Sequence, residues 1–271
     1  MDGKALAAAL HSGNRVYGTC VTMHSNQWPG MISRTGVDFV FIDTEHTPIQ
    51  CETLAMMCTM FRQHQVAPIV RIRSPDPYLA TQVLDGGATG IVAPYIETAD
   101  QVRALRGATK LRPIKGQRLQ KVLNEEETLE PQLQQYVDTR CADNVLAINI
   151  ESVPAIRNLD EILKVPGLDA VLVGPHDLSC SLGIAEEWTH PKMKAALEEI
   201  ISKCRAANVG VGVHISYSKD EERWCAENGA NFIVHSSDIS LCQEILTADL
   251  AQLRKDLGDH KNACDGGEIL I

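Results

Sequence analysis

The sequence has no Cys-x-x-C pair, no excess of positive charge, no long apolar run and no glycine-rich turn near its start. Its nine cysteines are an odd number and scattered, so neither a disulfide framework nor a zinc knuckle is indicated. The net charge of -10 argues against nucleic-acid binding, which needs a clustered basic face. No apolar stretch approaches the ~20 residues that span a bilayer, and no basic segment leads into an apolar one at the start. These absences predict a cytoplasmic protein with no nucleic-acid or membrane partner.

Short β-branched runs alternate with longer amphipathic stretches eight times along the chain. This alternation is typical of β-α units around a parallel sheet, and eight units favour a closed (β/α)8 TIM barrel. The length of 271 residues is close to the roughly 250 of such barrels. Gly18 stands alone in the first strand, which argues against an open sheet that binds a nucleotide. We expect a single α/β barrel domain over residues 1–257 and a tail of little periodicity over 258–271.

The apolar pattern sets the expected elements. The strands are expected at residues 16–21, 38–43, 68–72, 90–93, 145–150, 170–173, 209–214 and 231–234. The helices are expected at residues 28–35, 50–64, 77–86, 98–108, 153–164, 192–207, 219–228 and 238–257. A further helix at 3–10 is expected to close the bottom of the barrel. Residues 110–130 are expected to be irregular and to lie over the catalytic end.

Four of the apolar runs stop at charged or imidazole side chains, at the points where parallel strands would end. They lead into Asp43 to His46, Arg71, Glu151, and Gly174 to Asp177. The loops at the carboxyl ends of the strands surround one shared crevice in barrels and open parallel sheets. The pattern therefore predicts an active site in which two acids, a guanidinium and a histidine face each other.

The residue types at these strand ends indicate metal-assisted chemistry on an anion. Glu151 and Asp177 should leave adjacent strands whose axes lie ~4.8 Å apart, where two carboxylates repel unless a cation separates them. An oxygen-only pair suits Mg²⁺ or Mn²⁺ better than zinc, although each acid could instead cap the following helix. Arg71 ends an apolar strand and needs an anionic partner such as a carboxylate or an enolate. His46 would ordinarily be structural, and only its neighbours favour a catalytic role.

Four runs of the sequence carry a resemblance to a known family. They are FVFIDTEHTP, then PIVRIRSPDP with QVLDGGATGIVAPYIETADQ, then LAINIESVPAIRNLDEILKVPGLDAVLVGPHDLSCSLG, and finally ENGANFIVHSSD. In this order, from about residue 15 to 250, they resemble the HpcH/HpaI aldolase family. These are metal-dependent pyruvate aldolases related to 4-hydroxy-2-oxoheptanedioate aldolase and to 2-keto-3-deoxy-sugar-acid aldolases. The I-E-S motif with NLDEIL, followed one unit later by G-P-x-D-L-S, is more specific than any single short motif.

The resemblance implies roles for individual residues. Glu151 and Asp177 match the family's metal-binding acids, for a divalent ion such as Mg²⁺, Mn²⁺ or Co²⁺. Arg71 matches its substrate-binding arginine and His46 its catalytic histidine. Asp85, in QVLDGGA, matches the acid that pairs with that histidine. A metal, a guanidinium and a histidine-aspartate pair are thus the implied catalytic groups.

Further positions follow from the same resemblance. Asp43 matches a site acid that helps to hold the water of the metal, and Gly174 and Pro175 match the loop whose backbone approaches pyruvate. Asn149, a substrate-binding position, stands where many relatives have glutamine. The segment with His235 replaces a smaller apolar sequence, so both departures bear on acceptor preference.

The implied reaction is the reversible cleavage of a 4-hydroxy-2-oxo acid to pyruvate and an aldehyde. The metal would act as electron sink, Arg71 would share the enolate charge, and His46 would move the proton. No lysine ends a predicted strand, which favours a metal chelate over a Schiff base. The alternatives are a barrel lyase acting on oxaloacetate or a CoA ester, a phosphate-handling barrel with Gly210-Val211-Gly212 as a weak cradle, and a non-catalytic protein that binds 2-oxo acids.

The last helix bears on assembly. The resemblance implies a homo-oligomer, a hexamer or dimer of trimers, in which this helix packs on a neighbouring subunit. Its apolar positions recur at helical spacing, at Leu241, Ile245, Leu246, Leu250 and Leu253. The alternative is that this stripe packs on its own barrel.

Overall fold

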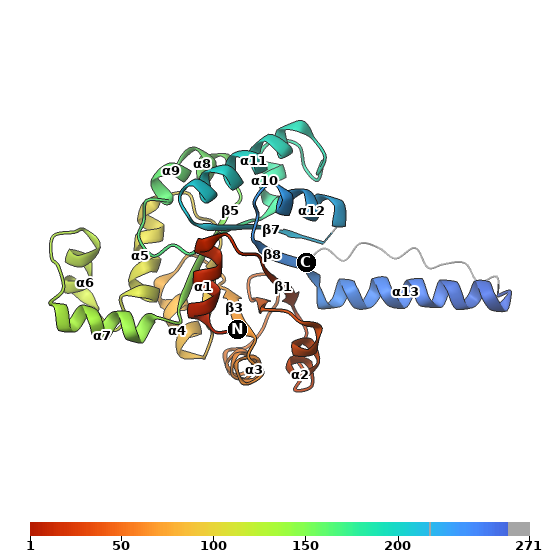
Figure 1. Cartoon of the computed structure of the whole chain (residues 1–271), viewed down its shortest axis with the longest axis horizontal. Helices are drawn as coiled ribbons and strands as arrows, with labels where there is room; N and C mark the ends of the chain where they lie inside the picture. Colours follow the sequence, from red (N-terminus) through yellow and green to blue (C-terminus); the bar gives the residue numbers. More distant parts are fainter. Residues whose placement is uncertain (217, 260–271) are drawn as a thin grey trace.

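Eight parallel strands form one closed barrel in the computed structural model, which describes residues 1–216 and 218–259 (Figure 1). Each strand pairs with its neighbours in the sequence, and β8 closes the barrel against β1. The strands are β1 (Val16–Val21), β2 (Phe39–Asp43), β3 (Ala67–Arg71), β4 (Gly90–Ala93), β5 (Val145–Ile150), β6 (Ala170–Val173), β7 (Gly210–Ile215) and β8 (Phe232–Ser237). The predicted (β/α)8 barrel is confirmed.

The helices lie between the strands, and one precedes β1. They are α1 (Gly3–Ser12), α2 (Trp28–Ile32) with the 3₁₀ turn η1 (Ser33–Thr35), α3 (Cys51–Gln63), α4 (Pro77–Asp85), α5 (Ala99–Lys110), α6 (Gly116–Leu123), α7 (Pro131–Cys141), α8 (Val153–Arg157), α9 (Leu159–Ile162), α10 (Pro175–Ser181), α11 (Pro191–Ala206), α12 (Lys219–Glu227) and α13 (Asp238–Leu257). Proline occupies one of the first two positions in six of them, where its fixed φ suits a helix start.

The interior of the barrel is filled by alternate side chains of the strands, because successive residues of a strand point to opposite faces. Phe39, Phe41 and Ile69 belong to one buried interior cluster, whereas the residues between them pack outward against the helices. Leu6 and Leu10 of α1 are fully buried in the same interior cluster. Helix α1 therefore closes the bottom of the barrel, as predicted.

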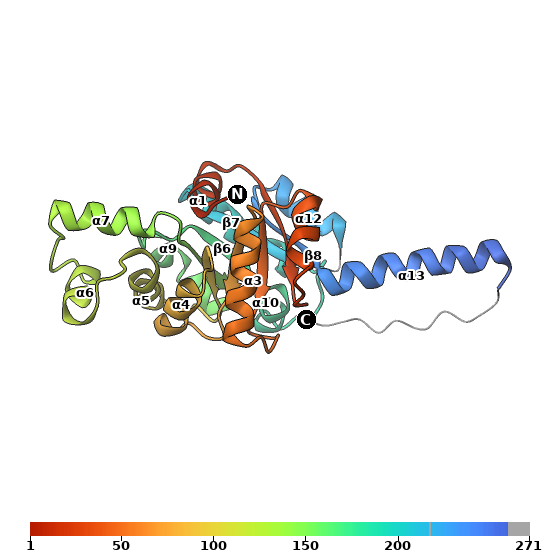
Figure 2. The same ribbon diagram turned by 90° about the horizontal axis from the view of Figure 1, so that it is seen from below.

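Residues 110–130 lie away from the catalytic end, so the expectation for this region was wrong. It contains α6, whose residues pack with those of α7 around Leu111, Leu123 and Val137. Both helices project from the side of the barrel in two views (Figures 1 and 2). The region follows the end of α5, and a helix in a β-α barrel runs back from the catalytic end to the opposite one. Arg112 accordingly contacts Asp85 at the end of α4.

Helix α13 extends from the barrel as a single long helix (Figures 1 and 2). Its start is held by Asp238, whose buried carboxylate accepts hydrogen bonds from the Thr22 hydroxyl at 2.8 Å, the Met23 N–H at 3.0 Å and the Trp28 indole at 3.0 Å. Ile245 and Leu250 are 59% and 39% exposed, so the predicted apolar stripe is not covered by its own barrel. Residues 260–271 of the expected tail lie outside the described residues. In the described part of the chain, no helix is both long and apolar enough to cross a membrane.

Candidate active site

The strand period places four polar side chains inside the mouth of the barrel. Each of the four comes two residues after an inward-facing position of its strand, and side chains two apart on a strand share a face. They are Asp43 of β2, Arg71 of β3, Asn149 of β5 and His214 of β7. Asp43 and Arg71 are also direct partners in the register of β2 and β3. The carboxyl ends of these strands therefore meet at one mouth, as the sequence pattern predicted.

Arg71 is held by two carboxylates. Its Nε and one terminal nitrogen donate to the two oxygens of Asp43 at 2.8 and 2.7 Å, and its other terminal nitrogen lies 3.2 Å from Glu45. Asp43 also accepts the Glu45 N–H at 3.0 Å. The resemblance implied that Asp43 helps to hold water at a metal. In this structure both of its oxygens accept hydrogen bonds from the guanidinium of Arg71.

Charge pairing outweighs burial in this cluster. Burial by itself would raise the pKa of the Asp43 carboxyl, but the hydrogen bonds and charge of Arg71 lower that pKa overall. Burial would likewise lower the pKa of Arg71, while the hydrogen bonds of Asp43 and the charges of Asp43 and Glu45 raise it. The pair is thus ionised throughout the physiological range. The Phe41 ring, 5.4 Å from the guanidinium carbon, supports it from within the barrel.

Glu151 is a buried carboxylate that accepts hydrogen bonds from two neutral donors. One oxygen accepts the Tyr95 N–H at 2.8 Å and the other accepts the Asn149 amide at 2.9 Å. Burial raises the pKa of Glu151, and so does the charge of Asp177, while the two hydrogen bonds lower it. A side chain at Gly174 would place its Cβ 2.6 Å from the Glu151 carboxylate, so the Glu151 side chain would have to shift to admit it. The approach of the Gly174 backbone to pyruvate stays a prediction.

Asp177 lies in the first turn of α10 and is exposed, and Pro175 begins that helix. Within residues 1–216 and 218–259, no cluster of three or more His, Cys, Asp or Glu side chains has the geometry of a metal site. Glu151 and Asp177 are the two acids that reach this mouth from β5 and β6, as the metal prediction requires. The Asn149 Oδ1 atom is buried and has no hydrogen-bond partner in the described structure. An oxygen-rich ligand set with such an open acceptor fits a hydrated hard cation.

His46 and Asp85 are not brought together within one chain. His46 follows β2, its side chain is 49% exposed, and it borders the mouth with Nε2 3.9 Å from Glu45. Asp85 is the last residue of α4, and its carboxylate pairs with Arg112. Because α4 runs back from the catalytic end, Asp85 lies at the opposite end of the barrel. The implied orientation of His46 by Asp85 therefore does not occur inside a single subunit.

The mouth encloses a cavity of about 340 Å³. Its walls include His46, Arg71, Asn149, Gly174, Pro175, Asp177 and His214. His214 is partly buried and packs against Phe41, with ring centroids 5.7 Å apart, and its Nε2 lies 3.0 Å from the Ser236 carbonyl oxygen. Burial lowers the pKa of His214 to about 4, and the nearby charge of Arg71 contributes. A neutral imidazole that donates to a carbonyl leaves its Nδ1 as an acceptor.

Two residues that hold the charged groups of the site, Glu45 and Tyr95, were not predicted from the sequence. Glu45 completes the pairing of Arg71, and Tyr95 holds Glu151 through its backbone at the strained φ of 56°. A hydrogen bond to Glu45, then burial and the neighbouring carboxylates, raise the pKa of Tyr95 to about 12. The sequence did contain a signal for Glu45, since this residue lies in the charged run after β2. It contained no signal for Tyr95, because the backbone conformation of Tyr95 is set by the loop after β4.

Comparisons with known proteins identify chains of similar sequence and fold. Residues 22–244 match the family model HpcH/HpaI aldolase/citrate lyase. The 2-keto-3-deoxy-L-rhamnonate aldolase of Shigella boydii serotype 4 (strain Sb227) is 30% identical over 248 residues, covering 90% of this chain and 91% of that protein. A solved HpcH/HpaI aldolase/citrate lyase family protein from Burkholderia cenocepacia J2315 is 24% identical with a TM-score of 0.80, covering 93% and 99% of the two chains. The solved citrate synthase SbnG is 27% identical with a TM-score of 0.77, covering 94% and 99%.

Proposed function

Since the chain belongs to the HpcH/HpaI aldolase/citrate lyase family and is a carbon–carbon lyase, we propose that it is a divalent-metal-dependent enzyme. The proposed reaction is the reversible cleavage of a 4-hydroxy-2-oxo acid to pyruvate and an aldehyde. Glu151 and Asp177 are the proposed metal ligands, and Arg71, Asn149, Gly174 and Pro175 the proposed pyruvate site.

The balance of charge at the mouth is the observation that carries the metal proposal. Arg71 is one cation, whereas Asp43, Glu45, Glu151 and Asp177 are four carboxylates around it. A 2-oxo acid brings a further negative charge, which this arrangement would repel. A divalent cation between Glu151 and Asp177 removes the repulsion and leaves the mouth able to bind an anion.

The residues present fit such an ion. Two carboxylates leave several coordination positions for water and substrate oxygens, which Mg²⁺, Mn²⁺ and Co²⁺ accept. When bound, the ion supplies Lewis-acid polarisation of the substrate's keto oxygen. Asn149 keeps Glu151 oriented through its amide, and the open Oδ1 of Asn149 is an acceptor within the same site.

The chain's own residues handle the charge and the proton. Breaking the C3–C4 bond leaves its electron pair on the pyruvate fragment as an enolate, while the C4 hydroxyl loses its proton and becomes the aldehyde carbonyl. Arg71, fixed in advance by Asp43 and Glu45, stabilises the negative charge of the enolate. His46, at the rim and accessible to solvent, accepts the hydroxyl proton and returns one to the enolate carbon.

One relative favours a second candidate function. SbnG is named a citrate synthase and is 27% identical to this chain over almost its whole length. A synthase would use the same enolate-stabilising groups to join an enolate to a carbonyl acceptor that carries further carboxylates. Activity with oxaloacetate as acceptor and none with simple aldehydes would favour this alternative.

We further propose that the enzyme is a homo-oligomer, a hexamer or dimer of trimers. The stripe on α13 leaves Ile245, Leu246 and Leu253 more than half exposed, and contiguous exposed apolar surface of this kind commonly marks an interface. If Asp85 serves His46, as the resemblance implies, it must do so from another subunit, because one chain keeps the two apart. Assembly would then complete the active site as well as cover the helix.

A metal-depletion experiment tests the main proposal. The protein is treated with a chelator, and exchange of the pyruvate methyl protons in D₂O is followed by NMR together with aldol formation. We expect both activities to disappear and to return with Mg²⁺, Mn²⁺ or Co²⁺. Borohydride added with pyruvate should leave the enzyme active. Chelator-resistant activity with a borohydride-trapped pyruvyl lysine would refute the metal mechanism.

A further inference from the structure

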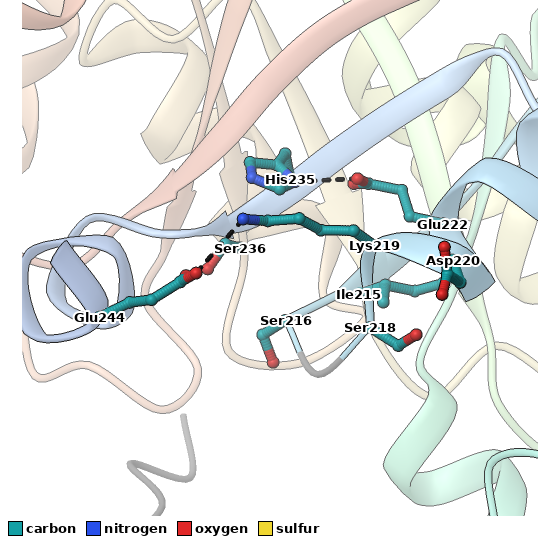
Figure 3. Close-up of a pocket in the computed structure, with 9 residues that line it drawn as sticks. All are labelled: Ile215, Ser216, Ser218, Lys219, Asp220, Glu222, His235, Ser236 and Glu244. Carbon is teal, nitrogen blue, oxygen red and sulfur yellow. Dashed lines mark hydrogen bonds and ion pairs between the residues drawn. The ribbon is translucent and has the colours of Figure 1, made fainter. Parts of the chain in front are cut away.

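A second cavity, of about 380 Å³, lies beside the first at the catalytic end of the barrel (Figure 3). The ends of β7 and β8, the start of α12 and the second turn of α13 form its walls. Ser216 borders both cavities, and the His214 ring of the first cavity bonds to the backbone of Ser236, which lines the second. The two cavities therefore adjoin at Ser216.

The cations of this cavity are already paired with carboxylates. Lys219 lies 3.2 Å from Glu244, and His235 lies 2.9 Å from Glu222, the two contacts drawn in Figure 3. Asp220 is a third acid of the lining, and it is paired with Arg223 one turn along α12. With His235 protonated, the three cations and three carboxylates balance, and with His235 neutral one negative charge remains in excess. An anionic group that enters the cavity therefore finds no unpaired cation among these residues, and it meets net negative charge when His235 is neutral.

The remaining lining is suited to hydroxyl groups. Ser216, Ser218 and Ser236 contribute hydroxyls, which both donate and accept hydrogen bonds, and the carboxylates accept them. The volume falls at the small end of the range of ligand sites, roughly 300–1,000 Å³. A short polyhydroxylated chain matches this space and this mixture of donors and acceptors.

We propose that this second cavity binds the distal, uncharged and hydroxylated end of the acceptor aldehyde. Glu222 and Glu244 thereby discriminate against acceptors that carry a second carboxylate. The inference rests on the proposed function, because the cavity sets acceptor preference only if pyruvate is converted to its enolate at the neighbouring mouth. It assigns the departure at His235 to acceptor selection, through the pair that His235 forms with Glu222.

The test reverses the charge of the cavity without removing bulk. Glu222→Gln/Glu244→Gln leaves Lys219 and His235 opposite Asp220, which is already paired with Arg223. The matched control, Glu198→Gln/Glu227→Gln, makes the same change in overall charge at two exposed acids of α11 and α12 outside the cavity lining. The measured quantity is the ratio of kcat/KM for glyceraldehyde to that for succinic semialdehyde, each with pyruvate.

We expect the wild type to prefer glyceraldehyde by about tenfold or more, and the cavity variant to reduce that preference by about tenfold. The control variant should keep the wild-type ratio. A ratio cancels any loss of activity common to both acceptors, and circular dichroism verifies folding. If the double variant does not fold, Glu244→Gln alone serves, because the Glu244 side chain is 59% exposed, and the same direction of change is expected.

Exchange of the pyruvate methyl protons in D₂O tests the aldolase proposal separately from the acceptor assignment, because the exchange needs no acceptor. Exchange in the wild type together with an unchanged ratio in the cavity variant, or with a wild-type preference for succinic semialdehyde, would overturn the acceptor assignment and leave the aldolase proposal standing. Absence of exchange in the metal-loaded wild type would overturn both.

Discussion

Replacing Asp43 by asparagine would test whether Arg71 works because it is fixed in advance. The two side chains have the same shape, so the packing around β2 is preserved. An amide offers one acceptor oxygen and no charge, so one of the two hydrogen bonds to Arg71, at 2.7 and 2.8 Å, is lost. The amide NH₂ group then faces guanidinium N–H groups, donor against donor.

The size of the effect follows from burial. The Asp43 side chain is fully buried and that of Arg71 is 11% exposed, so solvent replaces little of what is lost. Removing one partner of a buried ion pair costs about 3–5 kcal/mol. Glu45 still lies 3.2 Å from Arg71, which places the expected loss at the lower end, about 3 kcal/mol. A displaced guanidinium should also lower kcat/KM for cleavage by about 10²-fold.

Urea unfolding and steady-state kinetics give the two measurements. The control is Asp160→Asn, which breaks the exposed contact of Asp160 with Lys203 at 3.1 Å and should change stability by less than about 1 kcal/mol. A change in the unfolding free energy of Asp43→Asn no larger than that of the control, with activity within twofold of wild type, would refute the role given to Asp43.

The pH dependence of folding stability provides an independent test of the Asp43–Arg71 pair. Because the pKa of Asp43 is lowered on folding, its contribution to stability is present above the unfolded-state pKa of about 3.9. That contribution is lost as the pH falls through the lower folded-state pKa. The stability difference between wild type and Asp43→Asn should therefore shrink below about pH 4. A difference that stays constant there would contradict the assignment.

Three further predictions concern other parts of the chain. Glu151→Gln/Asp177→Asn should weaken Mn²⁺ binding at least about tenfold in calorimetric titrations; unchanged affinity would place the metal elsewhere. A hydrogen bond to Asp169 raises the pKa of His11, so its stabilisation is present below about pH 6.5 and is lost as the pH rises through the folded-state pKa. The urea midpoint of His11→Asn should therefore approach that of wild type at alkaline pH, and a constant gap would exclude this linkage. Leu250→Lys should dissociate the oligomer in light scattering, and a wild-type monomer would rule out assembly through α13.

The barrel could be predicted because strand periodicity and strand ends are both local signals. Seven of the eight strands match their expected ranges within one residue at each end, as for β5 and β6. Strand β8 continues three residues beyond its expected end at 234, because His235 still pairs with Ile215 and, after a shift in register, Ser237 pairs with Cys20. Helices α7 and α10 were not anticipated, since short helices present too few turns for their apolar spacing to stand out.

The site was predictable only in part. Side chains that interrupt an apolar run at a strand end, such as Glu151 and Arg71, could be placed at the mouth from the sequence. His214 was not among the residues predicted for the site, because its place beside Phe41 depends on closure of the barrel. The motif around Asp85 identifies a residue type but not its position in space, which the direction of α4 determines.

The pairing of Arg71 with Asp43 and Glu45 changes the chemical role that the sequence indicated for this arginine. The sequence indicated that its guanidinium needs an anion, and the natural inference was that the substrate provides it. In the structure Asp43 and Glu45 already balance its charge, so Arg71 cannot also neutralise Glu151 and Asp177. In the proposed mechanism the arginine is therefore a rigid donor aimed at developing charge, which costs no reorganisation during the reaction. The proposed divalent cation would then offset the remaining acids, so that two positive groups divide the two roles first considered for a single arginine.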